Sequence, residues 1–408
     1  MNASKKIRVM LVVPMLDQGG LERVCALTSQ LLQNKYEVYV VVFNGIGRIY
    51  DVSGAELIDL GLGAVSNKWG KMLQVVKRAA RLSKIVKEKK VQIVYSFGRT
   101  ANIACSLIYT KVKKICACHS HEEIKNIKYL RLMDKRADII LCCSKAMAKE
   151  VGTCIGSDKV KAVWNPCDIQ DIQQLAEVSL PAFQEFFKHH NKIIVAMGRE
   201  DDVKGYWHLI KAFRRIWENN NSVGLVIIGN GEFTEYRELA RNLQIEQDIL
   251  FTGVQKNPFC YLKKSNVLVL SSLSEGLPNT LVEAMAVGLP VVSVNCQSGP
   301  AEILEDEWDK VDTDSKIYKG TYGILTMPFN DEKDMMFDLR DNKIQLSIQE
   351  MLLSDAVWQI LQNEQLEHKY IQAGLERCND FSKEAYYNKI VNCFEQLVNE
   401  NEENIISY

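Results

Sequence analysis

The chain has 408 residues, of which 47% are hydrophobic and 25% charged, and its formal net charge is −1. This composition is typical of a globular protein and excludes a disordered or fibrous chain, while the length predicts two or three domains with their own cores. No run of eighteen apolar residues occurs, and the first six residues lead directly into a predicted strand, so we expect a cytoplasmic protein without a signal peptide. The 12 cysteines are scattered without C-x-x-C spacing, which predicts reduced core thiols.

The small net charge conceals two oppositely charged halves. Residues 1–190 contain 29 Lys and Arg against 17 Asp and Glu, a net +12, whereas residues 191–408 contain 21 against 34, a net −13. Cations are concentrated in 68–90, where six apolar residues recur at helical spacing: Met72, Val75, Val76, Ala79, Leu82 and Val86. Such a basic amphipathic helix either binds an anionic membrane or is the solvated face of a helix packed on a sheet. No zinc module or aromatic-interleaved basic motif accompanies it, so nucleic acid is not a predicted partner.

Predicted strands and helices alternate along the chain. Near-continuous apolar runs, as expected of buried parallel strands, lie at 7–13, 37–43, 92–96 and 138–143, and the pattern recurs at 192–197, 224–228 and 267–270. Helical stretches between them indicate right-handed βαβ units. The sequence therefore predicts an α/β fold of two Rossmann-like domains, 1–187 and 188–381, with a terminal helix at about 382–408.

Two carboxylates flank a predicted helix start after the strand at 267–270. Glu275 and Glu283 are eight residues apart, with Gly276 and Pro278 between them. On one continuous helix they would be separated by about 12 Å, beyond the roughly 5–9.5 Å of a glycosidase pair. The two carboxylates are therefore expected to bind two ends of one extended ligand. A helix that begins near Pro278 would present free N–H groups, which suit a diphosphate. The alternative is a capping box of Thr280 and Glu283, which needs no ligand.

Two cations follow the strand at 192–197, at the edge where open α/β sheets bind nucleotides. Arg199 and Lys204 lie in the loop Gly198–Gly205. A guanidinium and an ammonium there can neutralise a pyrophosphate. Alternatively, they are surface cations beside Asp201 and Asp202.

Glycines and histidines follow strands of the first half. Gly19 and Gly20 either let the backbone approach a ligand or form an ordinary turn, and they lack the G-x-G-x-x-G spacing of a dehydrogenase. His119 ends the run 114–118, and His121 follows it; neither has partners at metal-site spacing. Asp312-Thr313-Asp314 spells a DxD triplet, but no predicted strand leads into it, and we interpret it as a solvated loop. It lies in the charged stretch 305–345, which we expect to include an irregular surface segment.

The segment Ser274–Val292 resembles the donor-site signature of family 4 glycosyltransferases with the GT-B fold. Segments 198–213, 228–232, 251–258 and 298–304 are also similar to that family, so the resemblance covers most of the chain and is strongest over 196–304. It implies that the two Rossmann-like domains face each other across a cleft and that the C-terminal helix crosses back to the first domain. It also implies transfer with retention of anomeric configuration, without a metal or another cofactor.

The resemblance assigns roles to the candidate residues. The catalytic set is Glu275 at the donor sugar, Arg199 and Lys204 at the diphosphate, and His119 at the donor sugar, with His121 as its competitor. Donor-binding residues are Glu283 at the ribose, the backbone near Val254 at the nucleobase, and a set around the sugar and phosphates: Gly19, Gly20, Gly198, Gly229, Gly276, Leu277, Pro278, Asn279 and Thr280.

The expected function is transfer of a hexose or N-acetylhexosamine from a nucleotide sugar to a glycan or lipid-linked acceptor, in surface polysaccharide or glycolipid synthesis. UDP is the favoured nucleotide and GDP the alternative. We expect the protein in the cytoplasm, at the inner face of the membrane. The competing hypotheses are a two-domain nucleotide-sugar epimerase, which would turn over without an acceptor, and a non-catalytic nucleotide-sugar-binding protein.

Overall fold

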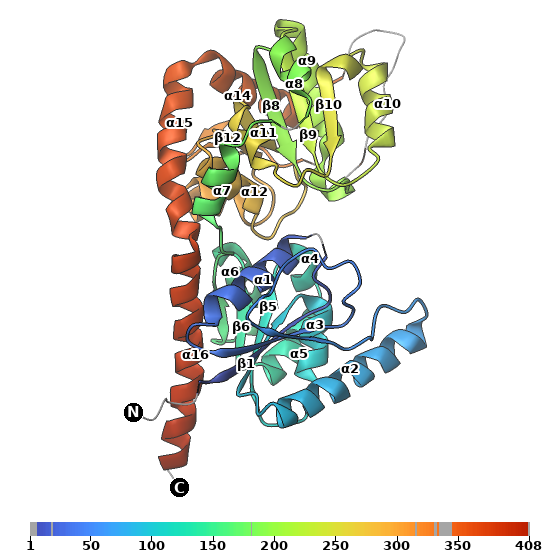
Figure 1. Cartoon of the computed structure of the whole chain (residues 1–408). Helices are drawn as coiled ribbons and strands as arrows, with labels where there is room; N and C mark the ends of the chain where they lie inside the picture. The colour runs from blue at the N-terminus through green and yellow to red at the C-terminus, as the bar shows by residue number, and fades with distance from the viewer. Residues whose placement is uncertain are drawn as a thin grey trace. The chain divides into compact units, whose positions relative to one another are not determined.

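The computed structural model describes residues 6–406 apart from 18, 181, 315, 330–332 and 334–344 (Figure 1). The chain forms two compact units: unit 1 contains Met1–Pro166 and Lys383–Tyr408, and unit 2 contains Cys167–Ser382. The expected boundary at 187/188 thus falls inside unit 2. Helix α7 (Ile169–Ala176) belongs to unit 2 because Asn257 Nδ2 donates to the Leu175 carbonyl at 2.7 Å, and Gln173 Nε2 donates to the Ala286 carbonyl at 3.1 Å.

Unit 1 is built on a seven-stranded parallel sheet with the strand order β3-β2-β1-β4-β5-β6-β7. The central strands are apolar on both faces, as a parallel sheet covered by helices requires. Its strands are β1 (Arg8–Val13), β2 (Glu37–Val42), β3 (Glu56–Asp59), β4 (Ile93–Phe97), β5 (Lys113–Cys118), β6 (Ile139–Cys142) and β7 (Val160–Ala162).

The two faces of this sheet support separate hydrophobic clusters. Val9, Leu11 and Val13 of β1 point to one face, and the alternating Met10 and Val12 point to the other. The first cluster includes residues of α1 and α16, and the second includes residues of α2 and α3. The helices are α1 (Gly20–Leu32), α2 (Lys68–Glu88), α3 (Arg99–Ser106), α4 (His121–Ile124), α5 (Ile127–Arg136), α6 (Lys145–Ile155) and α16 (Lys383–Ile406).

Helix α16, the last element of the chain, completes the core of unit 1. Phe394 meets the Tyr36 ring edge-on at a centroid distance of 5.3 Å. The Tyr386 hydroxyl lies 2.7 Å from Thr28 Oγ1 of α1, and both groups are buried. The amphipathic pattern at the end of the sequence therefore packs on the first unit, as the family resemblance implies.

Unit 2 contains a second seven-stranded sheet, with the order β10-β9-β8-β11-β12-β14-β13. All its pairings are parallel except that of β13 with β14. Within the charged stretch 305–345, Ile324 and Leu325 of β14 are fully buried beside β12, a strand that the sequence analysis did not predict. Residues 330–332 and 334–344 of this stretch lie outside the described part. The strands are β8 (Lys192–Met197), β9 (Val223–Ile228), β10 (Ile249–Gly253), β11 (Val267–Leu270), β12 (Val291–Val294), β13 (Tyr318–Lys319) and β14 (Ile324–Thr326).

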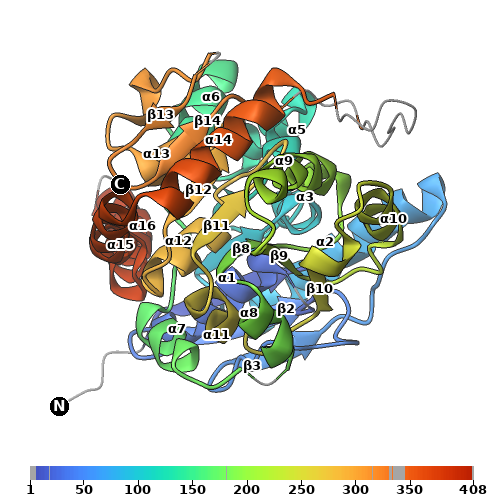
Figure 2. The same cartoon turned by 90° about the horizontal axis from the view of Figure 1, so that it is seen from above.

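Helices cover both faces of this sheet. Figure 2 shows α9, α10 and α14 on one face and α11 and α12 on the other. One hydrophobic cluster of unit 2 contains Trp207 of α9 and Leu353 of α14, both fully buried, together with residues of β8 and β9. The helices after α7 are α8 (Gln184–His189), α9 (Tyr206–Asn219), α10 (Thr234–Asn242), α11 (Phe259–Lys263), α12 (Asn279–Ala286), α13 (Pro300–Leu304), α14 (Ile348–Gln362) and α15 (Glu364–Arg377).

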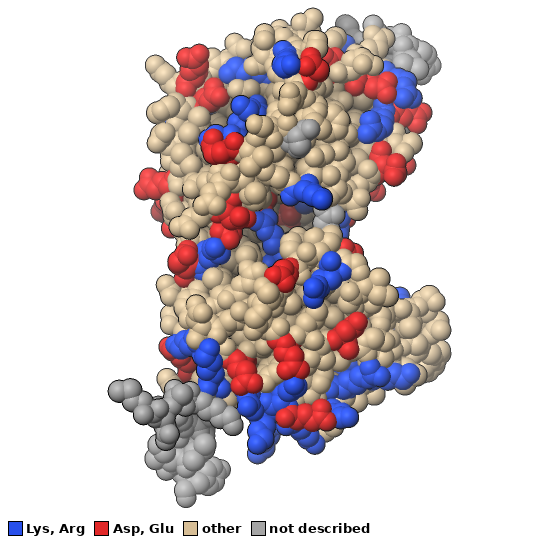
Figure 3. Space-filling model, viewed as in Figure 1, with Lys and Arg blue, Asp and Glu red and all other residues tan. Residues whose placement is uncertain are grey.

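The basic helix expected near 68–90 is α2, and its packing corrects the sequence interpretation. Leu82 and Val86 are buried against the sheet, but Met72 and Val76 are exposed. Arg78 is buried: its guanidinium donates to the Leu62 and Gly63 carbonyls and lies over the Phe43 ring. On the face seen in Figure 3, Lys and Arg side chains gather along the edge of unit 1 that α2 occupies. In the described residues, no helix is long and apolar enough to span a bilayer.

Candidate active site

The loops after neighbouring parallel strands of unit 2 meet at one edge of its sheet. Strands β9, β8, β11 and β12 are adjacent in this order, so the segments 229–232, 198–205, 271–278 and 295–299 all start from the carboxyl edge. Ligands of open α/β sheets bind outside this edge. The predicted site residues of the second half lie in these segments or at the start of α12, except for those of the turn after β10.

Lys204 and Glu275 form an ion pair at this edge. The distance between Lys204 Nζ and Glu275 Oε1 is 2.7 Å, and the two side chains are only 21% and 13% exposed. Ser272 Oγ donates to the same oxygen at 2.6 Å. Both bonds end on Oε1, so the other carboxylate oxygen has no partner among the described residues. The structure thus brings together two side chains that lie 71 positions apart in the sequence.

Tight backbone contacts hold the Lys204 loop against the Glu275 loop. Leu273 donates its N–H to the Val203 carbonyl at 2.7 Å, and Ser271 Oγ donates to the Lys204 carbonyl at 2.9 Å. Gly205 has φ +59, and a Cβ there would lie 2.3 Å from the Ser271 carbonyl oxygen. A glycine is therefore required for Lys204 to approach Glu275.

A second close approach joins the loops after β8 and β9. A Cβ on Gly229 would lie 1.8 Å from the Gly198 carbonyl oxygen, which also accepts a hydrogen bond from the Tyr206 hydroxyl at 2.9 Å. Arg199 follows Gly198, but its side chain is 74% exposed and pairs with Asp201 at 2.9 Å. The structure therefore brings Lys204, and not Arg199, to Glu275.

Helix α12 begins directly after the Glu275 loop. Pro278 is its N-cap residue and makes no side-chain cap, so Thr280 lies inside the helix. The capping-box alternative for Thr280 and Glu283 is therefore wrong. Thr280 Oγ1 is shielded from solvent without a partner in the described part of the chain, and the Glu283 side chain is buried. Asn279 is the first residue of α12, so the free N–H groups of its first turn lie beside the Glu275 loop.

The segment after β12 packs against the Glu275 loop. Ser298, with φ +60, donates its hydroxyl to the Glu275 carbonyl at 2.7 Å. Gly299 has φ +93, and a Cβ there would lie 2.9 Å from the Gly276 oxygen and 2.6 Å from Pro278 Cδ. The Glu275–Pro278 loop, which includes Leu277, is therefore fixed by backbone contacts on the β12 side.

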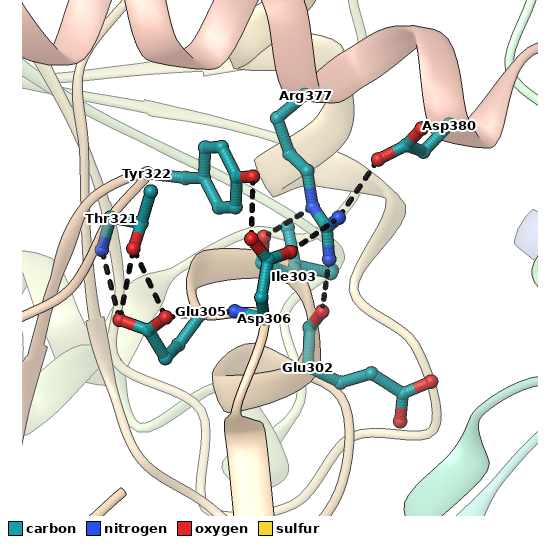
Figure 4. A network of polar contacts seen from close by, with 8 residues as sticks. All are labelled: Glu302, Ile303, Glu305, Asp306, Thr321, Tyr322, Arg377 and Asp380. Carbon is teal, nitrogen blue, oxygen red and sulfur yellow. Dashed lines mark hydrogen bonds and ion pairs between the residues drawn. The ribbon is translucent and has the colours of Figure 1, made fainter.

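Helix α13, which follows this turn, is anchored by the buried Arg377 at the end of α15 (Figure 4). Its guanidinium donates to the Glu302 carbonyl at 2.8 Å and to the Ile303 carbonyl at 3.1 Å, and it pairs with Asp306 and Asp380. These bonds satisfy carbonyls at the end of α13, which otherwise lack partners. Arg377 thus holds α13, the helix that follows the turn at 298–299, in place.

Val254 lies in the turn after β10, where Gly253 has φ +69. The Val254 side chain is exposed. Gln255 holds the turn, since its Nε2 donates to the Thr252 carbonyl at 2.9 Å and its Oε1 accepts from the Tyr261 hydroxyl at 3.1 Å. Val254 is therefore an exposed residue on a turn that side-chain hydrogen bonds hold in place.

His119 lies at the carboxyl edge of the unit 1 sheet, directly after β5. Its ring stacks on Phe97 at a centroid distance of 5.9 Å. Burial lowers the pKa of His119 to about 4, although the nearby Asn165 side chain opposes this shift. Neither ring nitrogen has a hydrogen bond of regular geometry within the described residues. His121, by contrast, is bound through Nε2 to Glu150 of α6 at 2.9 Å. His119 thus keeps both ring nitrogens, shielded from solvent, without such a bond to a described residue, whereas His121 uses one of its two.

Glu123 is a polar neighbour of His119 that the sequence analysis missed. Its Oε1 accepts from the His119 N–H and from Ser120 Oγ, each at 3.4 Å, while Oε2 is shielded and has no partner in the described part. Burial raises the pKa of Glu123 to about 7, and hydrogen bonding and the charge of Arg99 oppose the rise. In the sequence, nothing distinguishes this glutamate from the exposed Glu122.

Gly19 and Gly20 follow β1 at the same edge. Gly19 has φ −179, an extended conformation that any residue adopts, and Gly20 is the first residue of α1. The Gly19 carbonyl accepts from the Arg23 N–H at 3.1 Å. A Cβ on Gly19 would lie 2.1 Å from Glu22 Oε2. Gly19 therefore leaves space for the Glu22 side chain and has no special dihedral angle.

The Asp312–Asp314 triplet lies in a loop, with Asp312 and Asp314 exposed and Thr313 buried. Asp312 pairs with Lys316 at 2.5 Å and accepts from the Asp314 N–H at 3.0 Å, and these contacts lower the pKa of Asp312. Among the described residues, no group of three His, Cys, Asp or Glu side chains is arranged to hold a metal ion.

The sequence matches two protein families that cover different parts of the chain. Residues 18–171 match Glycosyltransferase Family 4, and residues 181–316 match Glycosyl transferases group 1. An uncharacterized glycosyltransferase of Methanocaldococcus jannaschii is 34% identical over 334 residues, which are 76% of this chain and 81% of that protein. This chain belongs to the family 4 glycosyltransferases.

A characterised relative and a solved structure are also similar to this glycosyltransferase. A Campylobacter jejuni enzyme that is 26% identical over 76% of this chain and 88% of its own length is named as an N-acetylgalactosaminyltransferase acting on a diacetylbacillosaminyl-diphospho-undecaprenol glycan. The crystal structure of Anabaena HepE with UDP and glucose matches 96% of this chain and 100% of its own, with a TM-score of 0.70 and 15% identity. The second likeness confirms the GT-B fold, and family membership identifies a glycosyltransferase rather than an epimerase.

Proposed function

We propose that this glycosyltransferase transfers a hexose or N-acetylhexosamine from a UDP-sugar to a glycan or lipid-linked acceptor in surface polysaccharide or glycolipid synthesis. The observation that carries the proposal is the Lys204–Glu275 ion pair at the shared edge of β8 and β11, next to the N-terminus of α12. A cation, a carboxylate and free amides together suit a sugar diphosphate. The UDP in the HepE structure and the lipid diphosphate in the name of the Campylobacter enzyme support this choice of substrates.

The ion pair suggests how the site changes when the donor binds. Glu275 Oε1 is shared between Lys204 and Ser272. A diphosphate oxygen beside Lys204 offers a second anion to the ammonium, whose three donors can bridge both groups. Glu275 is then held in place by Ser272 and Lys204 while its free oxygen accepts from a sugar hydroxyl. Arg199 reaches the diphosphate only after leaving Asp201.

The proposed reaction proceeds with retention of anomeric configuration and without a metal ion. The bond between the sugar C1 and the β-phosphate oxygen breaks, and UDP carries away the electron pair. The acceptor hydroxyl oxygen attacks C1 from the same face, and its proton passes to the departing phosphate. Lys204, Arg199 and the amides of α12 stabilise the negative charge that develops on the leaving diphosphate. His119, in its neutral form, contacts the donor sugar, and Glu283 contacts the ribose.

A product assay tests this function. The protein is incubated with UDP-, GDP- and ADP-sugars, each with and without a short-chain lipid-diphosphate sugar, and nucleotide release and the glycosylated product are measured. We expect UDP release that requires the acceptor, an axial or equatorial anomeric bond like that of the donor in the NMR spectrum, and full activity in EDTA. Turnover without an acceptor, an inverted product, or a loss with EDTA that manganese restores would each contradict part of the proposal.

We further propose a cytoplasmic location at the inner face of the membrane. All 12 cysteines are free thiols, and 11 of them are buried. Unpaired thiols at this number are typical of a reducing compartment. Fractionation of cells that express the tagged full chain tests this location, and recovery from an oxidising compartment would overturn it.

A further inference from the structure

The solvent-facing side of α2 carries a stripe of large apolar residues. Trp69 is 81% exposed, Met72 61%, and Leu73 and Val76 are each 55% exposed. Their spacing of three and four residues places them on one face of the helix. This face lies away from Leu82 and Val86, which are buried against the sheet. We call these four residues the α2 stripe.

An aromatic residue from another element extends the stripe. Tyr109, in the segment between α3 and β5, is 70% exposed, and Lys87 Nζ lies 5.1 Å from the centre of its ring. The Tyr109 N–H also donates to Ser83 Oγ of α2 at 3.4 Å. Trp69 near one end of α2 and Tyr109 beside the other are the residue types that favour the boundary between lipid and water.

Cations surround the α2 stripe. Helix α2 contains seven Lys and Arg residues and one acidic residue, Glu88. Arg78 and Arg81 are bound to backbone carbonyls of the segment 60–63. Besides Arg81, the exposed cations of α2 are five lysines, of which Lys84 also pairs with the exposed Glu88 at 3.6 Å: Lys68, Lys71, Lys77, Lys84 and Lys87. Unit 1 as a whole has 30 Lys and Arg against 18 Asp and Glu, a net +12. The surface is therefore apolar along its centre and positive around it.

We infer that the α2 stripe inserts into the interface of a bilayer that contains anionic lipid. Exposed apolar groups gain free energy on leaving water, and lysines beside them are attracted to lipid phosphates. A second copy of the chain is disfavoured as the occupant, because pairing two α2 helices would bring five exposed lysines against five. The inference rests on the proposed function for its purpose: a docked unit 1 keeps the enzyme at the surface where a lipid-linked acceptor resides.

Sedimentation of the full chain with vesicles tests the inference. Vesicles of phosphatidylcholine are compared with vesicles that also contain phosphatidylglycerol, at 0.1 M and 1 M salt. The first variant, Trp69→Ser/Leu73→Ser/Val76→Ser, removes apolar groups, and the second, Lys77→Ser/Lys84→Ser, removes charges. A matched control, Val178→Ser/Ile348→Ser, changes two exposed apolar residues of unit 2.

We expect the wild type and the control to bind the anionic vesicles and to bind neutral ones at least tenfold more weakly, since each Lys near the surface strengthens binding by roughly a factor of five. The first variant should lose roughly tenfold or more in partitioning at both salt concentrations. The second should differ from the wild type mainly at 0.1 M salt, because the screening length falls from about 10 Å to about 3 Å at 1 M. Trp69→Phe should remove a blue shift of the fluorescence that vesicles cause.

Three results would overturn the inference: the first variant binding as the wild type does, neutral vesicles binding as well as anionic ones, or a dimer in the absence of vesicles that the first variant dissociates. Because the substituted side chains are exposed, melting temperatures should stay within a few degrees of the wild type. Turnover with a water-soluble acceptor separates this inference from the proposed function. A variant that loses vesicle binding but keeps this turnover supports both, whereas an inactive wild type that binds vesicles contradicts only the proposed function.

Discussion

We expect Lys204 to have two roles, as the partner of the Glu275 carboxylate in the folded protein and as a cation at the leaving diphosphate. Lys204→Ala should lower kcat/KM by about 2–4 kcal/mol, or roughly 30- to 1,000-fold, because the charge on the leaving diphosphate loses a fixed cation. It should also lower the free energy of unfolding by about 1–3 kcal/mol, since the partly buried Glu275 carboxylate loses its partner. Steady-state kinetics and chemical denaturation measure the two effects.

The double variant Lys204→Ala/Glu275→Gln separates these effects. The neutral amide no longer needs the ammonium, so the double variant should recover much of the stability that Lys204→Ala loses. Its activity should not recover, because both groups that we assign to the donor are changed. Recovery of activity together with stability would show that Lys204 acts only as the structural partner of Glu275.

His119 and Glu123 should give opposite dependences of stability on pH. The folded-state pKa of Glu123 is raised to about 7, so the stability from its protonated form is lost as pH rises from about 4.5 to 7. The folded-state pKa of His119 is lowered to about 4, so the stability from its neutral form is lost as pH falls from about 6.5 to 4. Each shift is worth up to about 3 kcal/mol. The two slopes largely cancel in the wild type.

Single substitutions should expose these slopes. Relative to the wild type, Glu123→Gln should become more stable as pH rises from 4.5 to 7, while His119→Asn should become more stable as pH falls from 6.5 to 4. Denaturation curves at a series of pH values measure both differences, and Glu122→Gln, on the exposed side of α4, is the control. Parallel pH profiles for the wild type and Glu123→Gln would show that the pKa of Glu123 is the same in the folded and unfolded protein.

At the scale of elements, two glycines with similar dihedral angles should respond differently to the same substitution. Gly205 and Gly253 have φ of +59 and +69, but a Cβ would meet the Ser271 oxygen at 2.3 Å only at Gly205, and it would meet nothing within 4 Å at Gly253. Gly253→Ala should therefore cost only the left-handed backbone, about 1–2 kcal/mol. Gly205→Ala should cost about 1–3 kcal/mol more, because the loops after β8 and β11 are forced apart.

Melting temperatures of the two variants measure this difference within unit 2. Because the Gly205 contact positions Lys204, we also expect Gly205→Ala to lower kcat/KM toward that of Lys204→Ala. Equal melting temperatures for Gly205→Ala and Gly253→Ala would mean that the loops can separate without cost, which would contradict the tight packing of this edge.

The same elements show what can be predicted from the sequence and what cannot. The strands that lead to the site are continuous apolar runs, and a local pattern suffices to identify them and the polar loops that follow. Arg78 lies in the basic stretch whose cations were expected either to bind lipid or to be solvated. Its burial could not be predicted, because its partners are the carbonyls of residues 62 and 63 in the preceding loop, and no local pattern indicates that contact. Strand β14 was missed because three buried residues between charged segments form too short a pattern. The pairing of Lys204 with Glu275 likewise depends on strand order, which spacing does not give.

At the scale of the whole molecule, the unit that begins the sequence is the last for which all residues have been synthesised. Unit 1 begins the sequence, yet its core includes α16 from the end. Unit 2 is a continuous segment that contains all of its own strands. Unit 1 therefore cannot complete its core until α16 has been synthesised, whereas unit 2 can fold as soon as Ser382 is made.

The dependence of unit 1 on α16 predicts a local effect of a distant substitution. Phe394 is fully buried and packs against Tyr36 and Tyr95, so Phe394→Ala should destabilise unit 1 by about 3–5 kcal/mol. Asn392→Ala, at an exposed position of the same helix, is the matched control and should stay within about 0.5 kcal/mol of the wild type. Hydrogen exchange of the backbone amides measures the opening of each unit separately. In Phe394→Ala, amides of β1 and β4 should exchange at least a hundredfold faster, while those of β8 and β11 keep their rates. Equal acceleration in both sheets would show that the units unfold together, and no acceleration in β1 and β4 would show that α16 contributes little to the core it completes.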